Sequence, residues 1–175
     1  MALLNKANLE GADLTKTLFS CSDLRGANLN KTDCSAANFN GADLYGCSFK
    51  KAILRRVNFR NFDLRGIDFS KADLRKADLR KSNLEKVNLF GADLRQALFA
   101  EANIREAYLS SSWLQGTDLQ SANLSKAILR YSIKLTSTQI QSAKIDCETK
   151  LPHYLKVYWT SETDFRCEEK TVLSS

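Results

Sequence analysis

The chain has 175 residues and a mass of 19.7 kDa, the size of one domain with room for a sizeable core. Its composition, 43% hydrophobic and 26% charged with a single proline, is typical of a globular protein and argues against disorder. No apolar run approaches the roughly 18 residues of a membrane span, and the N-terminal residues lack the pattern of a signal peptide. We therefore expect a cytoplasmic protein with no membrane contact. The first residues already follow the repeat described next, which leaves open whether a segment precedes them. The net charge of +6 favours acidic partners.

A five-residue repeat fills three-quarters of the chain. Its centres run from Leu4 to Leu129 in 26 consecutive units without an insertion, and 18 of them are Leu and six are Phe. A small residue stands two positions before the centre, Ala in 15 units, with Phe62 and Ile67 as the large exceptions. Asp or Asn precedes the centre in 18 units, and the two positions after it carry nearly all the Lys and Arg.

A period of five fits neither an α-helix nor a flat strand, because both would scatter the centres over several faces. The centres share one interior only if the chain bends once per unit, with the small residue and the centre inward and Asp or Asn outward. Asp, Asn and Gly suit such bends. Phenylalanines recur at multiples of twenty, at Phe19, Phe39, Phe59 and Phe99. Because like side chains stack well in successive layers, we predict four units per coil and a square section. A strand spacing of about 4.8 Å makes the rod about 30 Å long.

Units such as Ala72-Asp73-Leu74 and Ala77-Asp78-Leu79 resemble the pentapeptide repeat family, and the resemblance covers Ala2 to Tyr131. It implies an all-β solenoid over residues 1–131, a right-handed quadrilateral β-helix. Some family members protect DNA gyrase from quinolones by imitating DNA with an acidic rod. The rod of this chain is basic, so we expect no such protection. Because the family is abundant in cyanobacteria, the resemblance also suggests a cyanobacterial, hence bacterial, source.

Residues 132–175 are predicted to cap the C-terminal end of the rod. The repeat fails here because the next centre would be Lys134. Thr136 and Gln139 have the spacing of a capping box, which predicts a short helix near 137–143. Two short strands are expected around a turn at 160–163. Such a cap would cover the exposed edge of the last coil.

No catalytic, cofactor or metal site is expected, and we predict that the protein is not an enzyme. The cysteines form no CxxC pair, and His153 is the only histidine. The regularly placed aspartates occupy equivalent positions, which do not separate two pKa values as acid–base catalysis requires. An odd number of cysteines favours free thiols, and a Cys147–Cys167 disulfide remains the alternative. The five cysteines of the chain are Cys21, Cys34, Cys47, Cys147 and Cys167.

The positive charge concentrates in the middle of the rod, where Lys50 to Arg95 contain 13 Lys or Arg against six Asp or Glu. Four units per coil align several of these cations in columns, which we call the basic strip: Arg55, Arg56, Arg75, Lys76 and Arg95, with Lys51 and Lys71 on the preceding corner. The strip suggests an anion-binding surface for an acidic protein or for nucleic acid. Nucleic acid is the weaker candidate, because the strip has no interleaved aromatic residues and its pitch differs from the phosphate spacing. The alternative is a solvated face in which Asp73 and Asp93 pair with the arginines.

Apolar residues at outward positions form a second candidate surface near the C-terminal end. Such a patch marks an interface unless the tail folds over it, and Tyr154, Val157 and Trp159 are the tail residues expected to do so. A homodimer contact or a partner site is the alternative. We therefore predict a non-catalytic protein-interaction scaffold whose protein partner is unidentified. The outward residues, which we call the aromatic corner, are Phe90, Tyr108, Trp113, Ile128 and Tyr131.

Overall fold

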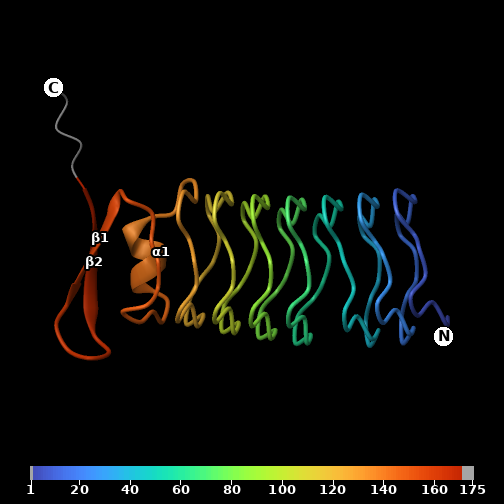
Figure 1. Cartoon of the computed structure of the whole chain (residues 1–175), viewed down its shortest axis with the longest axis horizontal. Coiled ribbons are helices and arrows are strands. Elements are labelled where there is room, and N and C mark those ends of the chain that lie inside the picture. The colour runs from blue at the N-terminus through green and yellow to red at the C-terminus, as the bar shows by residue number, and fades with distance from the viewer. Residues whose placement is uncertain (1, 171–175) are drawn as a thin grey trace, which may run out of the picture.

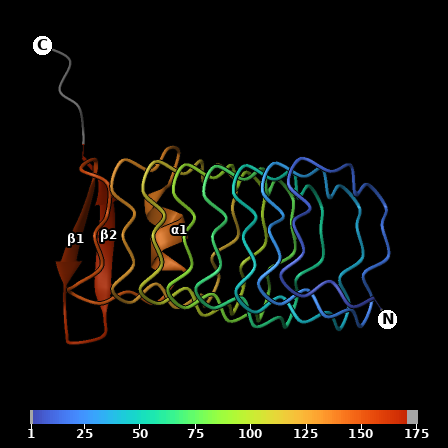
Figure 2. The same cartoon turned by 45° about the vertical axis from the view of Figure 1, so that its right-hand side comes forward.

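The computed structural model describes residues 2–170, which form a stack of coils with a small cap at the C-terminal end (Figure 1, Figure 2). Isolated parallel bridges join the coils, and through the repeat they pair residues twenty apart, from Leu3 with Asp23 to Trp113 with Ile133. The spacing of twenty agrees with the prediction from the phenylalanines, so four units complete each coil. Residues twenty apart therefore lie one above the other on the same side of the rod.

Each unit ends in a tight turn. The N–H of the next small residue donates to the carbonyl oxygen of the centre, as from Ala77 to Leu74 at 3.0 Å. The third residue of the turn has a positive φ, 60° at Lys76 and 64° at Gly91, as a type II turn requires. Asp and Asn do not take this position as a rule. They precede the centre and accept a hydrogen bond from the N–H two residues later, as Asp68 does from Ser70 at 2.8 Å.

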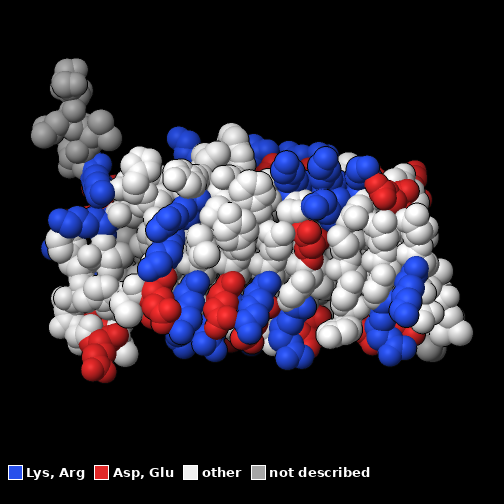
Figure 3. Space-filling view, in the orientation of Figure 1, with Lys and Arg blue, Asp and Glu red and all other residues white. Residues whose placement is uncertain are grey.

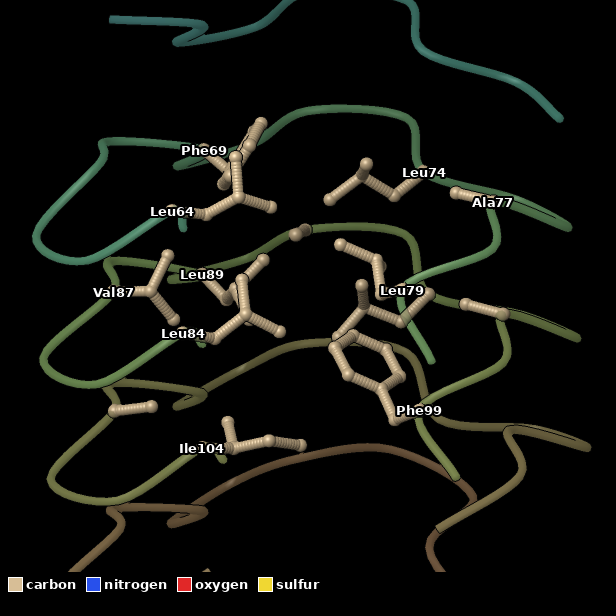
Figure 4. Packing of buried hydrophobic residues seen from close by; sticks show 14 of the residues in the cluster. Leu64, Phe69, Leu74, Ala77, Leu79, Leu84, Val87, Leu89, Phe99 and Ile104 are labelled. Atoms are coloured by element: carbon tan, nitrogen blue, oxygen red, sulfur yellow. The ribbon is translucent and has the colours of Figure 1, made fainter. Parts of the chain in front are cut away.

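The interior consists of stacked side chains from the centres and the small positions. Leu64, Leu84 and Ile104 lie in one column (Figure 4) and are fully buried. Phe19 and Phe39 stack in another column with ring centroids 5.2 Å apart. Burial of each such leucine or phenylalanine favours folding by about 1.5–3 kcal/mol before the loss of chain entropy is counted.

Among the coils that precede the cap, the ladder is interrupted at one place, between residues 36–46 and residues 56–66, which we call the seam. Outside the seam, each centre from Leu4 to Leu114 donates its N–H to the residue nineteen positions later, as Leu54 does to Asp73 at 2.8 Å. Within the described chain, the N–H groups facing the seam find no acceptor, and two bridges of the series are missing, 38 with 58 and 43 with 63. Figure 1 shows a wider interval between these coils on its lower side. The unpaired N–H groups belong to Ala36, Phe39, Gly41, Leu44, Gly46, Asn58 and Asp63, and to Asp68 at the edge of the seam.

Excess aromatic volume explains the seam. Phe62 occupies a position that is Ala in most units, and its ring meets that of Phe59 at 5.6 Å. Phe39 and Phe59 lie 5.6 Å apart and are tilted by 32° rather than stacked. Overfilled interiors are relieved by backbone shifts. The Asp63 side chain beside the seam is 56% exposed, against 19% for Asp73, which lies half a coil further on, on the opposite face.

The cap contains one helix and one hairpin: α1 (Ser137–Gln141), β1 (Leu155–Trp159) and β2 (Phe165–Glu169). The capping box predicted from Thr136 and Gln139 is present, although the helix ends at Gln141, two residues earlier than expected. The strands β1 and β2 are antiparallel, with Val157 opposite Cys167.

The cap supplies hydrogen-bond partners to the last coil. The Gln139 side-chain amide donates to the carbonyl oxygens of Leu114 and Thr117, at 2.9 and 2.7 Å. Lys144 and Lys150 continue the parallel bridges beyond Asn123 and Ile128. The edge that would otherwise invite another strand is therefore covered along these contacts.

Two further findings complete the fold. All five cysteines are free, so the alternative of a Cys147–Cys167 disulfide does not hold in this structure. Among residues 2–170, no helix has the length and apolar character to cross a membrane.

Candidate interaction surface

The basic strip lies on the middle coils. Asp73 pairs with Ile53 on one side and with Asp93 on the other, and Asp93 pairs in turn with Trp113. Because these residues form one column, the arginines two positions later in each coil, Arg55, Arg75 and Arg95, also lie in one column. Figure 3 shows Lys and Arg gathered along one edge over the middle coils, while along the opposite edge they alternate with Asp and Glu.

Two carboxylates bind the three arginines of the strip. Asp73 accepts from Arg55 Nε at 2.6 Å and from Arg75 Nη2 at 2.8 Å. Asp93 accepts from Arg95 Nη2 at 2.6 Å and lies 3.5 Å from Arg75 Nε. The predicted pairing of Asp73 and Asp93 with Arg75 and Arg95 is confirmed. Much of the charge of this column is therefore neutralised locally.

The uncompensated charge lies beside the column. Among the ion pairs of the described residues, none includes Arg56, Lys76, Lys51 or Lys71. All four are exposed and have a positive φ. Within the basic strip, the left-handed turn residue therefore carries the unpaired cations, whereas the residue before it carries the paired arginines.

The Asp73 carboxylate has a lowered pKa. Burial opposes its ionisation, but hydrogen bonds from Arg75 and Arg55 outweigh burial and bring the pKa to about 2. An unfolded aspartate titrates near a pKa of about 3.9. Because the folded pKa is the lower one, the paired carboxylate stabilises the fold above pH 4, and this stabilisation is lost as the pH falls from about 4 to about 2.

We therefore expect Asp73→Asn to flatten the dependence of stability on pH. The variant should be less stable than the wild type at pH 7, and the difference should shrink toward pH 2. Urea unfolding followed by circular dichroism at several pH values measures this. Asp118→Asn is the control, because Asp118 forms no ion pair among the described residues. An equal response of the two variants to acid would contradict the assignment.

The aromatic corner is exposed. The side chains of Tyr108, Trp113 and Tyr131 are 42%, 43% and 72% exposed. The rings of Phe90 and Tyr108 stack at 5.7 Å, and Ile128 pairs with Tyr108 on the next coil. The expectation that the tail folds over these residues is wrong.

The tail instead lies across the end of the rod. Tyr154 donates its hydroxyl hydrogen to the Ser132 carbonyl oxygen, at 3.1 Å, and accepts from the Leu135 N–H at 3.2 Å. Trp159 packs against Phe165 within the hairpin, with ring centroids 5.4 Å apart. The tail covers the end of the last coil and not its apolar side, because the backbone N–H and carbonyl groups at that end require hydrogen-bond partners when they are buried.

The basic strip and the aromatic corner form one surface. The Arg95 guanidinium lies over the Trp113 ring, 5.4 Å from its centroid. A cation over an aromatic face is a favourable contact. Sequence reasoning treated the two surfaces separately, although the spacing of twenty between Asp93 and Trp113 was enough to place Trp113 at the end of the arginine column.

The remaining reactive side chains are the thiols and the groups that could bind a metal ion. Among residues 2–170, no three His, Cys, Asp or Glu side chains lie together in a way that would hold a metal ion. Burial raises the pKa of the Cys34 thiol to about 11 and that of Cys47 to about 12. Both thiols therefore stay protonated and unreactive at neutral pH.

Comparison with known proteins establishes the family. A model of the pentapeptide repeat region matches residues 12–89, and a model of pentapeptide repeats (8 copies) matches residues 83–112 and 102–133. The chain belongs to the pentapeptide repeat family. Comparison with curated protein sequences gave no match.

Solved structures of the same family resemble this chain. One is HetL, a pentapeptide repeat protein involved in heterocyst differentiation regulation from the cyanobacterium Nostoc sp. strain PCC 7120. It is 27% identical, with 85% of this chain and 82% of HetL covered and a TM-score of 0.49. Another is QnrB1, a plasmid-mediated fluoroquinolone resistance protein, at 21% identity, 87% and 88% coverage and a TM-score of 0.44. Rfr23 from the cyanobacterium Cyanothece 51142 is 24% identical, with 82% and 87% coverage and a TM-score of 0.32.

Proposed function

We propose that this protein is a non-catalytic, cytoplasmic interaction module. Its rod is a right-handed quadrilateral β-helix, as family membership implies, with four sides supported by the twenty-residue bridge spacing. The rod presents the aromatic corner and the adjoining basic strip to another protein.

The exposed aromatic corner is the observation that carries this proposal. The side chains of Tyr108, Trp113 and Tyr131 are exposed on two successive coils, and the Arg95 guanidinium lies over the Trp113 ring. Tyr, Trp and Arg are the residues that most often dominate the energy of protein interfaces. A rigid rod also loses little conformational entropy on binding, because its turns and ladder already fix the backbone.

The partner surface should be acidic around an apolar centre. Arg56 and Lys76 supply positive charge that no carboxylate in the described chain neutralises. They lie beside the arginine column that ends at Trp113. Opposite charges across an interface accelerate association and select among partners. An acidic protein with one or two exposed apolar side chains satisfies both parts of the surface.

Nucleic acid remains the second candidate, because the strip is basic. The arginines of the central column are occupied by Asp73 and Asp93, and no aromatic side chain interleaves them. Protection of DNA gyrase by imitation of DNA fits this surface poorly, since such a mimic requires an acidic rod. A titration with duplex and single-stranded DNA at 50 and 200 mM salt distinguishes this candidate, because phosphate contacts weaken steeply with salt.

We expect Trp113→Ala combined with Tyr108→Ala to weaken binding of the physiological protein partner by at least about tenfold, because interface anchors often contribute 2 kcal/mol or more. Capture from the native host by the purified protein supplies the partner, and titration calorimetry then measures affinity. Tyr45→Ala is the control, since Tyr45 is 74% exposed, more than either residue of the double variant, but lies on a distant coil. Equal affinity of the wild type and the double variant would reject the aromatic corner as the interface.

A further inference from the structure

We propose a phosphate-binding site at the corner of the rod where the seam begins, a site that goes beyond the protein partner considered above. A depression of about 440 Å³ lies there, bordered by three successive coils. Its walls combine four cationic side chains with the backbone of the coil on the far side of the seam. The lining residues are Ser35, Ala36, Arg55, Arg56, Arg75 and Lys76.

The seam leaves a backbone donor free at this depression. On the next coil the equivalent bond is present, from the Arg56 N–H to the Arg75 carbonyl oxygen at 3.0 Å. The Ala36 N–H would donate in the same way to the Arg55 carbonyl oxygen, but across the seam this bond is absent from the described structure. Ala36 itself is exposed and short. Its N–H therefore faces a space that a bound anion can enter.

The charged groups around the depression retain free donors. Arg55 bonds to Asp73 through Nε, and its terminal nitrogens form no hydrogen bond with the described residues. Arg56 and Lys76 enter no ion pair there. The nearby carboxylates are already engaged: Asp73 binds Arg55 and Arg75, and Asp33 accepts from the Ser35 N–H at 2.9 Å. Guanidinium, ammonium and backbone donors thus converge on one space without a competing free carboxylate.

A phosphate group suits these donors better than a carboxylate does. Its oxygens are arranged tetrahedrally and accept from several directions, whereas the two oxygens of a carboxylate lie in one plane. Guanidinium groups bind phosphate through two parallel bonds, lysine acts as a point charge, and backbone N–H groups complete many phosphate sites. The ligand is therefore a phosphate monoester or inorganic phosphate.

The same corner, further along the rod, provides an internal comparison. A second depression of about 440 Å³ is lined by Arg75, Lys76, Arg95, Gln96, Gln115 and Gly116. There the ladder is closed, with the Gln96 N–H donating to the Gln115 carbonyl oxygen at 3.0 Å. The two hollows have the same size and share two cations. In the second hollow the turn N–H groups of Lys76 and Gln96 both donate to the next coil, whereas in the first hollow the Ala36 N–H finds no acceptor among the described residues. If phosphate binding depends on the seam, phosphate must bind more tightly in the first hollow than in the second.

Titration of the ¹⁵N-labelled protein with inorganic phosphate tests this site. We expect the Ala36 amide resonance to shift and saturate, and the Gln96 amide to change little. Arg56→Gln and Lys76→Gln should each weaken binding at least fivefold, because each removes one charge from the space. Lys51→Gln is the control, since Lys51 is also unpaired and left-handed but lies on another corner. An unmoved Ala36 amide, or equal shifts near all exposed lysines, overturns the proposal.

A second variant tests the backbone donor without altering charge. Phe62→Ala relieves the crowding that opens the seam, so the Ala36 N–H should pair with Arg55 and phosphate should bind more weakly. If the variant closes the seam and still binds phosphate with unchanged affinity, the amide takes no part and the proposed site is wrong. Failure of these tests leaves the Trp113 and Tyr108 experiment untouched, because those residues lie outside the depression.

Discussion

Replacing Leu84 by alanine should lower the free energy of unfolding by about 3 kcal/mol, because a fully buried leucine is removed from a stacked column and a cavity remains. Leu84 is completely buried between Leu64 and Ile104 (Figure 4). Its neighbours on the adjoining coils are held by the ladder and cannot collapse into the gap. Urea unfolding followed by circular dichroism gives the difference.

Leu18→Ala is the matched control for this prediction. Leu18 occupies an Asp or Asn position and is 76% exposed, so the same chemical change removes no buried contact. We expect less than about 0.5 kcal/mol, as for ordinary surface substitutions. Similar losses in the two variants would contradict the inward and outward assignment of the repeat positions.

Replacing Phe62 by alanine should close the seam. The removed ring is the one that exceeds the space available at a small position, and its loss allows the two coils to approach and form the missing ladder bonds. We expect the amides of Phe39, Gly41 and Leu44 to exchange with solvent at least about tenfold more slowly than in the wild type, since a closed ladder resists local opening. Hydrogen exchange measured by NMR resolves these positions.

The control for the seam lies one coil further on. The Phe59, Asn61 and Leu64 amides occupy equivalent positions and donate to Asp78, Arg80 and Asn83 at 2.7–3.0 Å. They should exchange slowly in both proteins. Equal protection of the two sets in the wild type would show that the ladder is continuous in solution and would remove the structural basis of the seam.

Much of the coil arrangement was predictable because the repeat is local and regular. Four units per coil followed from the phenylalanine positions, and the twenty-residue bridge spacing agrees with it. The capping box at Thr136 was predictable for the same reason, since its signal lies within four residues. The end of α1 was less well predicted, because a short helix stops where tertiary contacts take over. Here the Ser142 carbonyl oxygen accepts from the Ser121 N–H of the last coil at 2.7 Å.

The seam could not be predicted, although its cause is visible in the sequence. Phe62 and Ile67 stand out as large residues at small positions, but spacing alone does not show whether an interior will absorb the volume or separate. The outcome depends on the four phenylalanines at neighbouring centres, which already fill these coils. The same limit applies to Ala36, whose free N–H results from crowding at residues far along the chain.

The placement of the candidate surfaces was predictable, but their electrostatics were not. The column of Arg55, Arg75 and Arg95 follows from the period. Which cations remain unpaired follows from side-chain geometry. Arg75 and Arg95 reach back to the Asp two positions earlier, and Arg55 reaches Asp73 on the next coil. Arg56 and Lys76 form no ion pair with the described residues. The tail was mispredicted because apolar complementarity was weighed above the hydrogen-bonding needs of the final coil.

The twenty-residue register also limits how such a rod can change length. Adding or removing four units would lengthen or shorten the rod by one coil, and every later residue would stay on the same side of the rod. Adding or removing a single unit would rotate everything beyond it by a quarter turn and separate Trp113 from the arginine column below it. The angle about the rod axis between the two surfaces is thus set by the number of five-residue units that separate them. Rods with different numbers of units between the surfaces can display the same arrangement only when they differ by whole coils.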